Sequence, residues 1–188
     1  MITKQDLIYR QIVNLSDGGR VLLRPLTRDD RQPLLDLYRP VNSDERRYFR
    51  HDASQPEVVE KWIDELDYNK VFPIVAIVND RIVGNATLHF GEGPARHRGE
   101  IRIFLSKEIR GRGIGTRMLQ ALINVAKRRN LCLLEVQILS DQNSVIRAFK
   151  NLGFELRSIL EDYFILPDGE MRDIAHLVLH LHDPAGEF

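Results

Sequence analysis

The sequence predicts an α/β fold: one domain with a mixed, mostly antiparallel β-sheet and helices on both faces. Two observations favour this class. Strand-like and helix-like segments do not simply alternate, because three strands follow one another in the middle and hairpins stand at both ends. A glycine-rich turn, Arg110-Gly-Arg-Gly-Ile-Gly115, also separates an apolar strand from a long amphipathic helix. With 188 residues, one domain is expected over residues 1–188, with its core at about 20–181.

The first half predicts a hairpin followed by two helices. Strands at residues 9–15 and 20–24 flank Ser16-Asp-Gly-Gly19, a composition typical of hairpin turns. Thr27-Arg-Asp-Asp30 is expected to cap a helix that ends before Pro40. Pro56 suits the first turn of a second helix. The apolar stripe of that helix consists of Val58, Val59, Trp62, Ile63 and Leu66.

The second half predicts strands and helices around the glycine turn. Strands at 71–78 and 81–90 are joined by the two-residue turn Asn79-Asp80, and a Gly/Pro loop leads to a strand at 100–106. The next elements are a helix to about Arg129, a buried strand at 131–139 and a helix at 141–151 that Gly153 ends. A last hairpin joins 154–166 to 171–181 around Pro167-Asp-Gly169.

Composition excludes several classes of protein. The 27 basic and 27 acidic residues balance, which argues against broad electrostatic binding to nucleic acid and leaves only a local patch open. Cys132 is the only cysteine, so no internal disulfide forms, and its apolar surroundings predict a buried core thiol. The apolar stretch 71–78 is too short for a membrane span, and the N-terminus lacks a signal segment. We therefore expect a cytoplasmic protein.

The glycine turn predicts a site for a diphosphate. Gly111, Gly113 and Gly115 leave bare backbone amides at the positive end of a helix. The turn lacks the lysine of a nucleoside-triphosphate P-loop, and Thr116 stands where a dinucleotide fingerprint requires glycine. Taken alone, the hexapeptide is also typical of a plain glycine turn that caps a helix.

Arg110-x-x-Gly113-x-Gly115 after a strand resembles the acyl-CoA motif of the GNAT acetyltransferase superfamily. The resemblance continues through the strand at 131–139, the polar break Ser140-Asp-Gln-Asn143 and the helix that ends Asn151-Leu-Gly-Phe154. It covers most of the chain from about residue 20. It implies a GNAT-like sheet that is splayed between the fourth and fifth core strands. It also implies an acetyl-CoA-dependent N-acetyltransferase that needs no metal.

The resemblance also assigns residues to the cofactor site. The backbone of Ile103, Phe104 and Leu105 would pair with the pantetheine arm, and the amide near Leu105 would donate to the acetyl oxygen. The amide of Gln142 or Asn143 would bond the pantetheine. Phe149 stands where the superfamily usually has a tyrosine as general acid, which leaves the proton donor of the departing thiolate open. The segment expected to wrap the diphosphate comprises Arg110, Gly111, Arg112, Gly113, Ile114, Gly115 and Thr116.

Glu100 is the predicted catalytic base. An alkylamine has a pKa of about 10.4 and must lose a proton before it attacks a thioester. Glu100 opens its strand on the same face as Arg102 and Phe104. A glutamate at this offset resembles the base of a bacterial protein-lysine acetyltransferase branch that regulates acyl-CoA synthetases. The alternative is a surface carboxylate that is solvated or paired with Arg98 or Arg102.

The favoured acceptor is a protein lysine. Ser43-Asp-Glu-Arg-Arg-Tyr-Phe-Arg50 resembles the segment that joins the first two helices in the same branch and borders its acceptor cleft. The alternative is a solvated connection that Tyr48 and Phe49 anchor. Two other functions stay open: acetylation of a small amine such as a polyamine, aminoglycoside or amino acid, and a non-catalytic acyl-CoA-binding sensor. The six histidines, His176 and His180 included, show no metal spacing.

Overall fold

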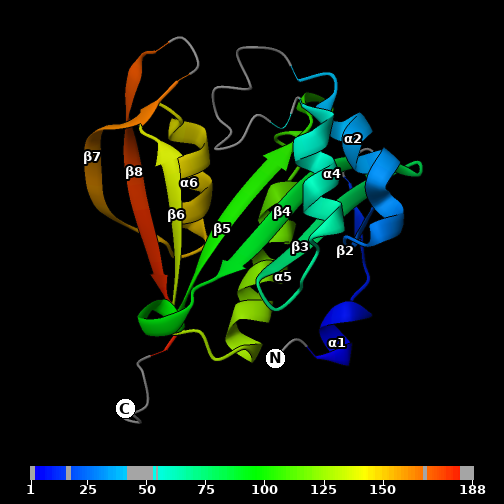
Figure 1. Cartoon of the computed structure of the whole chain (residues 1–188), viewed down its shortest axis with the longest axis horizontal. Helices are drawn as coiled ribbons and strands as arrows, with labels where there is room; N and C mark the ends of the chain where they lie inside the picture. The colour runs from blue at the N-terminus through cyan, green and yellow to red at the C-terminus, as the bar shows by residue number, and fades with distance from the viewer. Residues whose placement is uncertain (1–2, 16–17, 42–52, 54, 167–168, 183–188) are drawn as a thin grey trace.

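The computed structural model describes residues 3–15, 18–41, 53, 55–166 and 169–182. The described strands form one mixed sheet in the order β1-β2-β3-β4-β5-β6-β8-β7 (Figure 1). The strands are β1 (Gln11–Asn14), β2 (Arg20–Pro25), β3 (Val71–Val78), β4 (Arg81–Phe90), β5 (Arg98–Leu105), β6 (Leu133–Leu139), β7 (Glu155–Ile165) and β8 (Met171–His180). The helices are α1 (Lys4–Leu7), α2 (Arg31–Tyr38), α4 (Pro56–Asp64), α5 (Ile114–Arg128) and α6 (Asn143–Asn151), with 3-10 turns η1 (Arg28–Asp30), η2 (Gly93–Ala95) and η3 (Lys107–Ile109).

Helices cover both faces of the sheet, as the sequence predicts. On β3, the side chains of Phe72, Ile74 and Ala76 join the core that contains α5. Val75, on the opposite face, joins the core formed with α2 and α4. Because both faces of β3 are covered, the strand is apolar along its whole length. Figure 1 shows α2 and α4 in front of the sheet and α5 behind it.

Several local predictions are confirmed. Asn79 and Asp80 have φ values of 47° and 60°, the left-handed pair of a type I′ turn, and β3 and β4 have the predicted bounds. Pro56 opens α4, and Gly153 has a φ of 94° just beyond α6. Cys132 is a buried free thiol. Among the described residues, no helix is long and apolar enough to cross a membrane.

The boundaries of other elements differ from the predictions. The predicted start at Thr27 begins with the 3-10 turn η1, so α2 itself starts at Arg31. The fourth predicted helix starts at Asn143 instead of residue 141, because Gln142, at ψ 58°, is not yet helical. The short helix α1 was missed, although its capping box, Thr3 with Asp6, is visible in the sequence. The predicted Ser16-Asp17 part of the first turn lies outside the described residues.

The fold opens between β5 and β6. These two strands run parallel and pair only at Arg98–Leu133, Gly99–Leu134 and Glu100–Glu135. Beyond that register β5 continues beside β4 as far as Leu105, whereas β6 continues beside β8 (Figure 1). The predicted splay between the fourth and fifth core strands is therefore present. Its consequence is an interval in the sheet where, within the described part of the chain, one side of β5 has no neighbouring strand.

Candidate active site

The glycine turn lies at the wide end of this interval. Gly111 and Gly113 have φ values of 74° and 79°, and a Cβ atom on either would meet nothing within 4 Å. Their left-handed backbone, rather than crowding, is what requires glycine. Gly115 differs, because a Cβ there would lie 3.1 Å from Cδ1 of Leu105. The start of α5 therefore packs closely against the end of β5.

Backbone amides at the start of α5 lack backbone partners. Among the described residues, no backbone carbonyl accepts a hydrogen bond from the amides of Gly111 or of residues 113–116. The first bond of the helix runs from the Arg117 amide to the Gly113 carbonyl, at 3.2 Å. Unpaired amides and the positive end of the helix dipole together favour an anion. The predicted diphosphate segment therefore has the geometry to bind one.

Polar groups of the β5 backbone face the interval. The Ser106 amide donates to Val83 at 2.9 Å, and Arg98 accepts from the Gly91 amide at 3.0 Å, so even-numbered residues of β5 bond toward β4. Antiparallel pairing alternates, which points the backbone groups of Ile103 and Leu105 away from β4. The Leu105 carbonyl accepts a 2.9 Å hydrogen bond from Nε of Arg110.

Phe104 lies differently from its two neighbours on β5. Its backbone is paired with Asn85 of β4, and its ring stacks on that of Tyr38 from α2 at 5.2 Å. Burial raises the pKa of Tyr38 to about 12, despite the hydrogen bond with Asn85. The Tyr38 hydroxyl is therefore neutral over the physiological pH range and serves to hold α2 against the sheet.

Glu100 lies where β5 and β6 separate. Its carboxylate accepts hydrogen bonds from Nε and Nη2 of Arg102 at 3.2 and 3.0 Å, and its side chain is 18% exposed. The ion pair with Arg102, which the sequence analysis gave as an alternative to a catalytic role, is thus present. It holds the carboxylate on the face of the sheet that α2 and α4 cover in part. A carboxylate at this point is suited to accept a proton from a group lying between the strands.

Glu135 is a site residue that the sequence analysis missed. It is the register partner of Glu100 on β6 and lies 3.4 Å from Nη1 of Arg98 and 3.2 Å from Nε2 of His176. A charged residue inside the apolar run Leu133–Leu139 was the available signal. Among the described residues, no group of three or more histidine, cysteine or acidic side chains is placed to hold a metal ion.

The start of α6 completes the surroundings of the interval. Gln142 is the N-cap residue of α6, three residues after the end of β6, and its side chain makes no capping bond. Nδ2 of Asn143 lies 3.5 Å from the carbonyl of Asp141. Phe149 is only 1% exposed and packs edge-on against Phe154, with 5.1 Å between ring centroids. The structure therefore places Phe149 in the core, where it presents no polar group.

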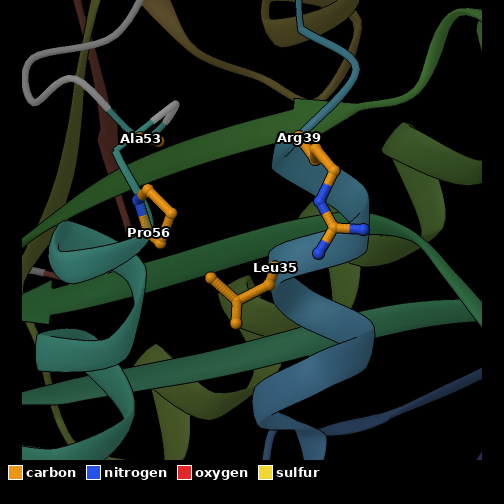
Figure 2. A pocket seen from close by; sticks show the side chains of 4 residues that line it. All are labelled: Leu35, Arg39, Ala53 and Pro56. Atoms are coloured by element: carbon orange, nitrogen blue, oxygen red, sulfur yellow. The ribbon is translucent and has the colours of Figure 1, made fainter.

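A small cavity lies apart from the interval, between α2 and the start of α4. Figure 2 shows its lining side chains, Leu35, Arg39, Ala53 and Pro56. Its volume of about 60 Å³ is well below that of a usual ligand pocket. The predicted acceptor segment, residues 43–50, lies outside the described residues. Its proposed role therefore stays a prediction.

Comparisons with known proteins agree with this architecture. The profile of the acetyltransferase (GNAT) family matches residues 34–154. An uncharacterized N-acetyltransferase from Methanocaldococcus jannaschii is 28% identical over 145 residues, which span 75% of this chain and 63% of that relative. The crystal structure of the GNAT domain of S. lividans PAT has a TM-score of 0.76 at 19% identity, covering 96% of this chain and 100% of that domain. The Salmonella typhimurium protein yncA, solved with its cofactor acetyl-CoA, has a TM-score of 0.73 at 18% identity, covering 88% and 96%.

Proposed function

The chain belongs to the acetyltransferase (GNAT) family, and from that premise we propose that it transfers the acetyl group of acetyl-CoA to a primary amine. The favoured acceptor is a lysine side chain of a protein. One observation carries the proposal: unpaired amides at the start of α5 lie beside a parallel strand pair that separates after three register positions. The first feature suits a diphosphate, and the second suits an extended arm that pairs with β5.

The residues present fit acetyl-CoA as a co-substrate. The amides from Gly111 to Thr116 hold the diphosphate, and Arg110 and Arg112 add positive charge. The backbone groups of Ile103 and Leu105 that point away from β4 form hydrogen bonds with the pantetheine. The bond to the Leu105 carbonyl replaces the one that this carbonyl accepts from the Arg110 side chain. Gln142 and Asn143, at the start of α6, follow the end of β6, and the side-chain amide of one of them bonds the pantetheine in this proposal.

Glu100 acts as the base in this proposal. It takes a proton from the acceptor amine, directly or through one water, and Arg102 keeps the carboxylate oriented between turnovers. The Leu105 amide faces the interval and donates to the acetyl carbonyl oxygen as negative charge develops there. Phe149 supplies no acid, so the departing thiolate takes its proton from water. A thiol pKa of about 8.5 makes the thiolate a tolerable leaving group.

The choice of acceptor rests on two resemblances. The offset of Glu100 from the glycine turn and the sequence of residues 43–50 both resemble the protein-lysine acetyltransferase branch. The balanced composition gives no support for a strongly acidic cleft of the kind that suits polycations. A protein lysine is therefore preferred over a polyamine or an aminoglycoside.

Thiol release from acetyl-CoA tests the proposal. The full chain is assayed with lysine peptides whose termini are blocked and with a matched set of small amines, and mass spectrometry locates the added acetyl group. Release with peptides is the expected result. Thiol release with small amines only would mean that the acceptor is a small amine instead of a protein lysine. Tight binding of acetyl-CoA without thiol release in the presence of any amine would mean that the protein is a sensor.

A further inference from the structure

Polar side chains cross the sheet in a row on the face opposite α5. His89 of β4 is the register partner of Glu100, Glu100 is the partner of Glu135, and His176 of β8 contacts Glu135. Arginines on β5 bind both carboxylates: Arg102 binds Glu100, and Arg98 binds Glu135. The row therefore contains both acidic and basic side chains, and each carboxylate in it is held by an arginine.

Glu135 is a carboxylate that lies largely out of solvent on the same face of the sheet as Glu100. Its side chain is only 17% exposed, whereas Leu134 and Val136, its neighbours in β6, face the core on the opposite side. Placing a carboxylate at such a half-buried position carries a desolvation cost. Adjacent strands lie about 4.8 Å apart and register partners face the same side, so the Glu135 carboxylate points the same way as that of Glu100.

We propose that Glu135 is a specificity-determining residue that binds the ammonium group of an alkylamine acceptor beside Glu100. Arg98 and His176 act as positioning residues that hold the Glu135 carboxylate in place. This inference rests on the proposed acetyl transfer. An ammonium has three N–H donors and so can bond both carboxylates at once, with one donor left for water.

The division of work between the two carboxylates follows from their positions. One N–H bond of the ammonium breaks, the proton forms an O–H bond on Glu100, and the electron pair stays on nitrogen for attack on the acetyl carbonyl. Glu135 keeps its charge and orients the nitrogen. An acceptor that is already neutral needs no such partner, so the loss of Glu135 affects charged acceptors selectively.

Glu135→Gln tests the assignment, because it keeps the shape and removes the charge. The full chain is assayed with a terminally blocked lysine peptide and with the same peptide carrying a hydrazide, uncharged at neutral pH, in place of the lysine amine. We expect kcat/KM for the lysine peptide to fall about 10- to 100-fold, mainly through KM, as for loss of a hydrogen bond to a charged group. The hydrazide rate and the affinity for coenzyme A stay unchanged. Glu161→Gln, on the exposed strand β7, is the matched control and changes neither rate.

Other outcomes separate the possible failures. An equal loss with both peptides, or no loss with either, overturns the role of Glu135 while wild-type turnover leaves the proposed function intact. No turnover by the wild type with either peptide refutes the protein-lysine acceptor on which the inference rests, and the small-amine assay described above then decides whether the proposed acetyl transfer itself fails. Should Glu135→Gln unfold, His176→Gln is the second variant, because it keeps the charge of Glu135 and removes the imidazole that contacts its carboxylate. A smaller rise in KM is expected, again for the lysine peptide and not for the hydrazide. An equal rise for both peptides overturns the inference.

Discussion

Gly113→Val probes the glycine turn most directly. Gly113 is the N-cap of α5 with a φ of 79°, and an added Cβ meets nothing within 4 Å. The cost of substitution is therefore conformational: about 1–2 kcal/mol for an L residue in the left-handed region. The folded chain keeps part of this strain, which lowers the free energy of unfolding, and relieves the rest by turning φ toward negative values, which turns the neighbouring amides away from the diphosphate.

The loss of stability and the loss of coenzyme A affinity are measured separately. Urea denaturation is expected to show a loss of about 1–2 kcal/mol, and titration calorimetry with coenzyme A an affinity at least about tenfold weaker, since tenfold corresponds to about 1.4 kcal/mol. Gly113→Asn is expected to lose less of both, because asparagine tolerates left-handed φ better than valine. Gly18→Val is the matched control: Gly18 has a φ of 83°, also with nothing within 4 Å of an added Cβ, but in the turn between β1 and β2. It should lose stability without losing affinity.

Two results would refute this reasoning. Wild-type affinity of Gly113→Val for coenzyme A would mean that the diphosphate binds elsewhere. Equal losses in the valine and asparagine variants would mean that the left-handed φ is not what demands glycine at this position.

Three further variants test the base, an ion pair and the core. Glu100→Gln should lower kcat by about 10²–10⁴-fold at unchanged coenzyme A affinity, and an unchanged kcat would remove Glu100 from the mechanism. Burial raises the pKa of Asp30, but hydrogen bonds from Arg24 and Thr27 outweigh it, so the pKa lies below its ordinary value. The pair therefore stabilises the fold above the unfolded pKa of about 3.9 and loses this effect as pH falls through the folded pKa. Asp30→Asn should cost about 1.5–3 kcal/mol in urea denaturation at pH 7, and this gap should narrow under strong acid. Phe149→Ala should lower the free energy of unfolding by about 3–5 kcal/mol, and a negligible loss would contradict its core position.

Local features were predictable because neighbouring residues decide them. Asn79-Asp80 takes the left-handed turn that its short polar side chains tolerate, and Pro56 starts a helix because its φ is fixed in advance. The apolar run at 131–139 predicted a buried strand, and β6 lies within it. Helix starts were less predictable, since Asp141 has the chemistry of a helix start but Gln142 is still not helical and α6 begins at Asn143.

The residues of the candidate site also differ in whether neighbouring residues or distant ones decide their role. The glycine turn and Glu100 were predicted from motif spacing within a segment of the chain. Glu135 was missed because its meaning depends on register: β6 lies beside β5 only after the whole of α5 has crossed behind the sheet. His176 reaches Glu135 from a strand much later in the chain.

The sequence by itself determined the order of the main elements and the glycine turn, because backbone preferences and hydrophobic periodicity act over a few residues. The residues suited to acyl transfer followed from the resemblance of the motif around Arg110, Gly113 and Gly115 to a known family. Only the tertiary structure decided that β5 and β6 separate after Glu100, that Phe149 belongs to the core, and that Glu100 and Glu135 are register partners where the strands part. Strand order and register are set by burial of both sheet faces at once, a condition on residues far apart in the chain.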